Sequence, residues 1–158
     1  MSDDDTKQLF WTALADSPNL MVGLHDRHEH SLPMRAQLDE DAHGAFWFFT
    51  RLDNRLAEGG RAMAQFAARG HSLFACIDGT LSRETDGTVL DRLWSNAVAV
   101  WYPDGKQQSD LLLLRFDLND AEVWTADVGV TGLFKMATGL TIKPGEVGDH
   151  ATLNLTSG

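Results

Sequence analysis

The amino-acid sequence predicts a mainly β, α+β fold: an antiparallel β-barrel with helices packed on its outside. Short apolar runs recur along the chain with turn residues between them, which is typical of antiparallel strands. Three longer stretches instead repeat their apolar residues every three or four positions, as helices do. The expected order is helix, three strands, helix, two strands, helix and two strands, which favours about six or seven strands in a barrel.

The N-terminal part is expected to begin with a helix and a β-hairpin. Asp3 to Asp16 has acids in its first turn and apolar residues on one face, and Ser17-Pro18 ends the pattern. Asn19 to Leu24 is apolar and predicts a strand. His25 to His30 would be the hairpin loop, and the second strand would run from Ser31 to Asp39.

The second and third strands carry the most informative patterns. From Ser31 to Asp39 apolar and polar residues alternate, so Arg35 is expected on the face opposite the apolar set, which is Leu32, Met34, Ala36 and Leu38. The chain then turns at His43-Gly44 into a third strand, Ala45 to Thr50, which contains the densest aromatic run of the sequence.

The middle of the chain is expected to add a helix and a second hairpin. Asn54 to Arg69 has helical spacing of its apolar residues, and the Gly59-Gly60 pair inside it would mark a close helix contact. A tight turn at Asp78-Gly79 would then join two antiparallel strands, His71 to Ile77 and Gly79 to Glu84.

The last part starts with the clearest helical pattern of the chain, which runs from Asp86 to Trp101. Trp94 and Trp101 lie seven residues apart on one face of it and are expected in the core. The remaining elements are expected to be a hairpin of Leu111 to Leu118 and Glu122 to Ala126 around Asn119-Asp120, a short helix Val130 to Ala137, a loop Pro144 to Gly148 and a strand His150 to Leu155.

Composition limits the possible functions. The chain has 158 residues, 43% hydrophobic and 23% charged, which predicts one soluble globular domain, 1–158. It has no apolar run of transmembrane length, and its N-terminus is acidic rather than signal-like, so a cytoplasmic location is expected. The single Cys76 fits a reducing compartment. A net charge of -10 disfavours nucleic acid and membrane partners and favours a small molecule in a local basic pocket.

The stretch Gly44 to Arg55 is the strongest candidate for a binding site. Its aromatic strand ends at Thr50, and Arg51, Asn54 and Arg55 follow just before the expected helix. A helix N-terminus with a hydroxyl and guanidinium groups is suited to a phosphate, and the aromatic residues to a flat apolar ring. Arg55 is expected to matter more than Arg51 for the phosphate, with Arg35 as the next candidate. The alternative is a core strand followed by an ordinary capped helix.

Two other groups of reactive side chains are given structural interpretations. The cluster from His25 to His30 contains three histidines and two acids, but it is interpreted as a solvated hairpin loop, and no metal site is expected. Cys76 is interpreted as a small core residue, because no cationic neighbour that would lower its thiol pKa is apparent.

Short motifs across the chain point to one family. They are Pro33-Met34 with Gln37, FWFFT followed by DN from Phe46 to Asn54, HSLFACIDG, DRLW, WYPDGK, LLLLRFD, AEVW and the late GDHA. Taken in order from Leu9 to about Leu155, they resemble the bacterial general stress proteins of the pyridoxamine-5'-phosphate-oxidase-like, FMN-binding split barrel. The resemblance implies a homodimer with FMN, or FAD, at the subunit interface.

The resemblance also implies where the flavin would lie. Its ring would lie against the strand around Met34 and its phosphate near Thr50. In the family the segment around Trp101 lies near the dimer interface, so contact with the partner's flavin is the alternative to a core position for Trp101. Leu32 and Leu56 stand where the family usually has basic residues. The candidate cofactor-binding residues are Pro33, Met34, Arg35, Ala36, Phe48, Phe49, Thr50, Arg51, Asn54, Arg55 and Trp101.

Three functions follow as hypotheses. The first is a flavin-dependent oxidoreductase of unknown substrate, whose catalytic residues the sequence does not identify. The second is a non-catalytic module that binds or senses a cofactor in the stress response, because no obvious general base lies in the expected pocket. The third is a structural dimer without a ligand. Efficient oxidation of pyridoxamine phosphate is not expected, because basic residues for a second phosphate are lacking.

Overall fold

A computed structural model describes residues 2–126, 137–139 and 149–156. Its seven strands form one antiparallel sheet with the order β2-β1-β4-β5-β6-β3, and β7 pairs with β6. The strands are β1 (Asn19–Leu24), β2 (Leu32–Arg35), β3 (Ala45–Arg51), β4 (Gly60–Ala67), β5 (Leu73–Arg83), β6 (Leu111–Thr125) and β7 (Asp149–Asn154). The helices are α1 (Asp3–Asp16), α2 (Gly87–Leu93) and α3 (Asn96–Ala99), with single 3-10 turns η1 (Arg55–Glu58), η2 (Arg69–His71) and η3 (Gly105–Gln107).

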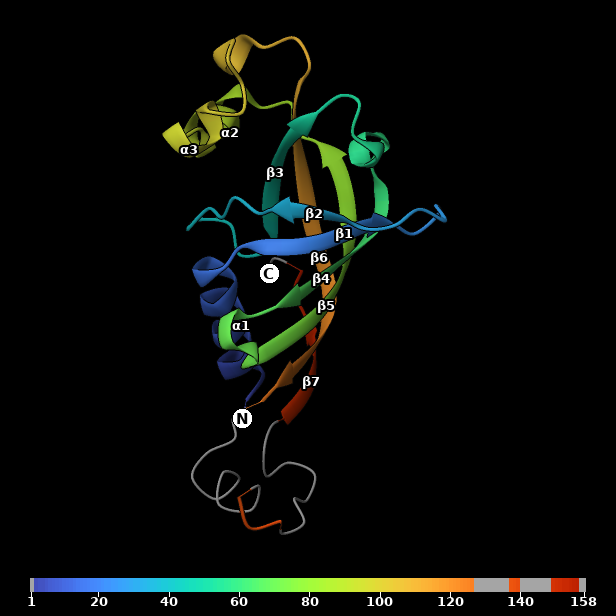
Figure 1. The fold of residues 1–158 in the computed structure, drawn as a ribbon, viewed down its shortest axis with the longest axis vertical. Coiled ribbons are helices and arrows are strands. Elements are labelled where there is room, and N and C mark those ends of the chain that lie inside the picture. The colour runs from blue at the N-terminus through green and yellow to red at the C-terminus, as the bar shows by residue number, and fades with distance from the viewer. Residues whose placement is uncertain (1, 127–136, 140–148, 157–158) are drawn as a thin grey trace.

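This architecture confirms the predicted antiparallel barrel with outer helices. In Figure 1, α2 and α3 lie at one end of the sheet, beyond β3, and the long β6 runs through the length of the molecule. The helix α1 packs elsewhere, against β5 and β7. The predicted bounds of α1 and β1 are confirmed, and those of β3 and β7 agree to within one residue. Of the described residues, none belongs to a helix long and apolar enough to cross a membrane.

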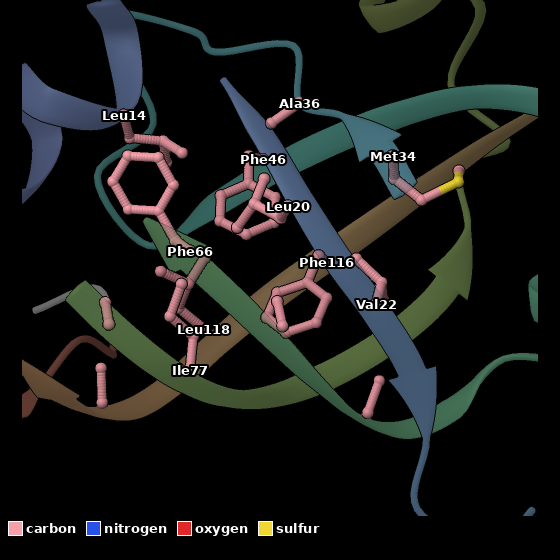
Figure 2. Close-up of a cluster of buried hydrophobic side chains, with 14 of the residues drawn as sticks. Leu14, Leu20, Val22, Met34, Ala36, Phe46, Phe66, Ile77, Phe116 and Leu118 are labelled. Carbon is pink, nitrogen blue, oxygen red and sulfur yellow. The ribbon is translucent and has the colours of Figure 1, made fainter. Parts of the chain in front are cut away.

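The core lies inside the curved sheet. Figure 2 shows side chains from β1 to β6 and from α1 directed at one another there. Phe46 on β3 stacks against Phe116 on β6, with ring centroids 4.9 Å apart. Burying aromatic side chains of this size gives the largest hydrophobic contribution per residue, so the FWFFT strand anchors the barrel.

The predicted helix from Asn54 to Arg69 is wrong. The chain there forms one 3-10 turn, η1, and then the strand β4, whose buried residues Ala62, Ala64 and Phe66 follow a period of two. In the sequence this apolar–polar alternation is weak, because alanine is only weakly hydrophobic. Gly59 ends η1 at φ 71°, where an added Cβ would lie 2.7 Å from the Leu81 carbonyl oxygen, so the glycine pair makes a turn rather than a helix contact.

The two predicted hairpins at Asp78-Gly79 and Asn119-Asp120 are also wrong. Each pair of short strands is one long strand, β5 or β6, and the expected turn residues lie opposite each other in the ladder. Asp78 pairs with Asp120 and Gly79 with Leu118, so Asn119 is the extra residue of a β-bulge. An added Cβ at Gly79 would lie 2.4 Å from the Asp117 carbonyl oxygen, which explains the glycine.

The predicted helix from Asp86 to Trp101 is divided into α2 and α3. Asp86 caps α2 as expected, but Trp94 is extended, with ψ 133°, and Ser95 caps the new helix α3. Trp94 is half-buried against the ring of Phe49, with centroids 5.7 Å apart. Trp101 is 72% exposed, so its predicted place in the core is wrong.

Two predictions fall largely on residues that the structure does not describe. All but the last residue of the predicted helix Val130 to Ala137, and the whole predicted loop Pro144 to Gly148, lie outside the described residues.

The two edges of the sheet, β2 and β3, meet at a single point. Gln37 and Trp47 exchange backbone hydrogen bonds of 2.7 and 3.1 Å, and within the described residues these two segments form no further pairing. The strand predicted from Ser31 to Asp39 is accordingly shorter, and Pro33, which has no N–H, lies on its edge as proline requires. The barrel is therefore split beyond this bridge.

Candidate functional site

A cavity of about 520 Å³ lies at the split between β2 and β3. The segment that carries α3 forms its outer wall. Its lining residues are Pro33, Met34, Arg35, Gln37, Phe49, Thr50, Arg51, Asp53, Asn54, Ser95, Ala97, Val98, Trp101 and Tyr102. This volume is within the range of sites for small organic ligands and cofactors.

The backbone edges of both strands turn toward this cavity. In an antiparallel ladder the residues that bond to one neighbour alternate with those that bond to the other. Because Trp47 bonds to Gln37, Phe49 directs its N–H and C=O to the same side. Ala36 donates its N–H to the Pro18 carbonyl, so Arg35 directs its own backbone groups away from β1 and toward the split. The cavity thus offers backbone donors and acceptors side by side.

Two arginines line the cavity, and they differ in their partners. The Arg35 side chain makes no hydrogen bond or ion pair with any residue that the structure describes. Arg51 donates from Nη1 to the Asp110 carboxylate at 2.9 Å and from Nη2 to the Trp101 carbonyl at 2.7 Å. Its guanidinium also lies 5.2 Å from the centre of the Tyr102 ring. Arg35 is therefore the lining cation that is free to meet an anion.

Thr50 and Asn54 form the polar end of the cavity. The Asn54 side-chain amide donates to the Thr50 hydroxyl at 2.9 Å, and its carbonyl accepts from the Leu56 N–H at 2.8 Å. With Asn54 as its donor, the Thr50 hydroxyl keeps its own hydrogen for a further acceptor. The four-residue η1 that follows does not supply the helix N-terminus expected from the sequence.

The structure places eight of the eleven candidate residues around the cavity and three elsewhere. Ala36 and Phe48 face the core on the inner side of their strands. Arg55 lies outside the cavity, where it donates to the His30 carbonyl at 2.6 Å and lies 3.8 Å from the Glu29 carboxylate. The turn η1 begins at Arg55 and buries Leu56, which directs Arg55 toward the β1–β2 loop.

Sequence reasoning missed several lining residues as site candidates. Gln37 was noted only as part of a motif, and Ser95, Ala97, Val98 and Tyr102 were assigned to one continuous helix and its end. An early break after Trp94 was the signal that could have revealed them, since Ser-Asn is a favourable helix start. Asp53, like Gln37, stands in one of the family motifs, as the first residue of DN.

Local electrostatics fix two protonation states near the wall. Burial raises the pKa of the Tyr102 phenol, and the nearby Arg51 only partly opposes this. Hydrogen bonds from Gln108 and from Arg51 lower the pKa of the Asp110 carboxyl. At neutral pH the phenol is therefore a neutral donor and Asp110 is a charged partner of Arg51.

The other reactive groups lie away from the cavity. His25 is hydrogen-bonded through Nε2 to Asp78, at 3.1 Å, and His28 and His30 are exposed. In the described part of the chain no three metal-binding side chains gather in one place. Cys76 is half-buried rather than in the core, and its Sγ contacts the Met63 Sδ at 3.2 Å.

The chain matches one family model and several solved structures. The model described as pyridoxamine 5'-phosphate oxidase-like matches residues 5–144. A general stress protein 26 from Jannaschia sp. CCS1 is 31% identical; the match covers 97% of this chain and 99% of that one, with a TM-score of 0.80. No curated protein matches the chain.

Two proteins from Xanthomonas are also similar. A general stress family protein from Xanthomonas campestris pv. campestris is 40% identical over 79% of this chain and 90% of that one, with a TM-score of 0.73. The general stress FMN/FAD binding protein from Xanthomonas citri is 40% identical over 77% and 89%, with a TM-score of 0.71. With the family model spanning most of its length and the Jannaschia structure nearly all of it, this chain belongs to the pyridoxamine 5'-phosphate oxidase-like family of split barrels.

Proposed function

We propose that this protein binds FMN in the cavity between β2 and β3. The observation that carries the proposal is the unpartnered guanidinium of Arg35 beside two strand edges whose backbone groups turn into the cavity. The similar protein from Xanthomonas citri is described as an FMN/FAD binding protein, which supports a flavin. One free lining cation suits the single phosphate of FMN better than the pyrophosphate of FAD.

The residues fit the separate parts of this ligand. Pro33, Met34 and Phe49 offer apolar surface to a flat ring, and the backbone groups of Phe49 and Arg35 match its polar edge. Continued past the Gln37–Trp47 bridge, the antiparallel register would place Arg35 across the split from Phe49, and Arg35 and Thr50 line the same cavity. A phosphate would then accept from the Arg35 guanidinium, the Thr50 hydroxyl and the Asn54 amide.

A bound flavin supplies one- or two-electron transfer, which makes an oxidoreductase the first functional candidate. This chain's own contribution would be binding, orientation and exclusion of water by the α3 wall. The Tyr102 phenol, whose pKa is raised by burial, would stay protonated and act as a hydrogen-bond donor rather than a base. A non-catalytic flavin-binding or sensing module is the second candidate, because the described lining residues include no histidine and only one carboxylate, Asp53, which is exposed.

Oxidation of pyridoxamine phosphate is not part of the proposal. That substrate carries its own phosphate, and the second lining cation, Arg51, is already paired with Asp110. Flavin-loaded protein given pyridoxamine 5'-phosphate and oxygen should show no turnover near the ~1–10³ s⁻¹ usual for enzymes. Turnover in that range would mean that a second phosphate site has been overlooked.

We also propose a homodimer with the cavity near the subunit interface. The neighbouring residues Val100 and Trp101, beside the cavity, are 77% and 72% exposed, which is unusual for two adjacent large apolar side chains. Sedimentation at micromolar concentration should give a dimer, and Val100→Asp with Trp101→Ser should shift it toward monomer. A monomeric wild-type protein would remove this part of the proposal.

The test of flavin binding is a titration of the purified full-length chain with FMN, followed by quenching of flavin fluorescence. We expect saturation at one FMN per chain and weaker binding of riboflavin, which lacks the phosphate. Equal affinity for both would show that no phosphate site exists, and absence of any binding would reject the proposal. Bleaching of the bound flavin's visible band by NAD(P)H then separates an oxidoreductase from a binding module.

A further inference from the structure

The outer wall of the cavity is a separate segment that runs from Ser95 to Asp110 and leaves the sheet between β5 and β6. Its only α-helix, α3, has four residues, and the segment exposes both Val100 and Trp101. Val98 and Tyr102 are its buried side chains, so its position depends on these two and on polar contacts with the barrel.

Arg51, at the end of β3, makes several of those contacts at once. Its Nη2 donates to the Trp101 carbonyl and its Nη1 to the Asp110 carboxylate, and its Cζ lies over the Tyr102 ring, 5.2 Å from the ring centre. It therefore joins three points of the wall to one strand of the barrel. A planar guanidinium can bind two acceptors while it stacks on a ring, which a lysine cannot do.

Among the described residues, two further contacts join the wall to the barrel. The Leu52 N–H donates to the Asp110 carbonyl at 2.9 Å, and Trp94 packs against both Phe49 and Tyr102. The ion pair of Lys106 with Asp91 at 2.9 Å joins the wall to α2 and not to β3. Asp110 also accepts from the Gln108 side chain, and this hydrogen bond holds the carboxylate in position to bind Arg51.

We propose that Arg51 is a positioning residue that holds the wall against the cavity and so sets how slowly a bound flavin leaves. This rests on the proposed function, since it concerns the same cavity. We assign the phosphate to Arg35 rather than Arg51, because the charge of Arg51 is paired with Asp110 and one hydrogen on each of its terminal nitrogens is already donated to the wall. In this proposal Arg35 binds the phosphate and Arg51 holds the wall, so the two lining arginines have different roles.

The first experiment needs no flavin. Hydrogen exchange of the flavin-free protein should be faster at the amides of Trp101, Tyr102 and Gly105 in Arg51→Ala than in wild type, by about tenfold or more, if one charge-assisted contact holds the segment. Arg51→Lys should lie between the two. Arg69→Ala, which removes an exposed partner of Asp16 far from the wall, is the matched control and should leave these amides unchanged. Unchanged exchange in Arg51→Ala would overturn the proposal.

The second experiment measures dissociation rates of FMN and of riboflavin. In each of Arg51→Ala, Asp110→Ala and the double variant, we expect FMN and riboflavin to leave faster by the same factor as each other. The double variant should match Arg51→Ala, because without Arg51 the carboxylate of Asp110 has lost its partner on the barrel. If Arg51 instead bound the phosphate, Arg51→Ala would affect FMN alone, and Asp110→Ala would free the guanidinium and slow the release of FMN. Either result would overturn the proposal. Asp110→Asn, which keeps the size of the side chain, serves if Asp110→Ala does not fold.

The two proposals fail in different ways. If wild type binds neither flavin, the proposed function is rejected, and the exchange experiment still decides whether Arg51 holds the wall. If wild type binds FMN and the Arg51 variants release it as slowly as wild type, the positioning role is rejected and the flavin site stands.

Discussion

Two polar clusters on the same sheet differ in whether they are complete. At the bulge of β5 and β6, Asp78 is buried, with 9% of the residue exposed, and its carboxylate accepts from Arg61, Asn119 and His25 at 2.9–3.1 Å. At the split between β2 and β3, Arg35 has no partner within the described residues. The first cluster satisfies its buried charge within the chain, and the second leaves a cation to the cavity.

The difference separates stability from binding. Burial raises the pKa of the Asp78 carboxyl, but the hydrogen bonds from Asn119, Arg61 and His25 together outweigh it, so that pKa lies below its ordinary value. Folding therefore favours the ionised form and gains from it. The Arg35 guanidinium has no comparable partner among the described residues of the folded chain, so it can bind an anionic ligand. Each cluster can be removed without the other, which makes the comparison testable.

The largest effect is expected for Asp78→Ala. Loss of a buried carboxylate that accepts from three side chains should lower the free energy of unfolding by about 2–4 kcal/mol. Urea denaturation measures this, and the affinity of the folded variant for FMN should not change. Asp16→Ala, which removes an exposed ion pair with Arg69, is the control and should stay within about 0.5 kcal/mol of wild type. A loss of FMN affinity in Asp78→Ala would mean that the clusters are coupled.

The opposite pattern is expected for Arg35→Ala. Affinity for FMN should fall roughly 10- to 100-fold, the value of one charge-assisted contact, while affinity for riboflavin and stability to urea stay as in wild type. Fluorescence titration of both ligands measures it. Arg35→Lys keeps the charge and should recover part of the affinity. An equal loss for riboflavin would show that Arg35 shapes the cavity and does not meet a phosphate.

A smaller effect on stability is expected when the pH is lowered from 5 to 3. Because the folded-state pKa of Asp78 is below the ordinary value of 3.8, its contribution is present above that value and is lost as the pH falls through the lowered pKa. Urea midpoints of wild type should therefore fall from pH 5 to pH 3 more steeply than those of Asp78→Asn, which cannot titrate there. Parallel curves for the two proteins would contradict the assignment.

The smallest effect is expected for Arg55→Ala. Arg55 bonds to the β1–β2 loop outside the cavity, so its removal should change the affinity for FMN by less than about twofold. This reverses the expectation from the sequence, which placed Arg55 at the phosphate. If Arg55→Ala lowers the affinity for FMN as much as Arg35→Ala does in the same titration, the expectation from the sequence is right and the phosphate lies beyond Asn54.

The sequence by itself determined the elements whose patterns are local and strong. The capped, acid-first helix α1 and the strands β1, β3 and β7 follow from residues that lie next to each other in the chain. Alternation around Met34 was sufficient to put Arg35 on the opposite face from the core, and it lies there. Eight of the eleven candidate residues line one cavity, because that interpretation depended mainly on the short segments from Pro33 to Arg35 and from Phe49 to Asn54.

Only the tertiary structure decided what depends on contacts between distant segments. Asp78-Gly79 and Asn119-Asp120 have the composition of turns, but in the ladder between β5 and β6 they form a bulge. Gly79 leaves room for the Asp117 carbonyl of the other strand, and the Asn119 side chain donates to the Asp78 carboxylate. Pairing of β4 with β1 and β5 overrides the helical spacing after Asn54, and Arg55 turns outward as a result. The cavity itself exists because β2 and β3, the two edges of the sheet, touch at one bridge and no further, and no local pattern encodes the distance between two edges.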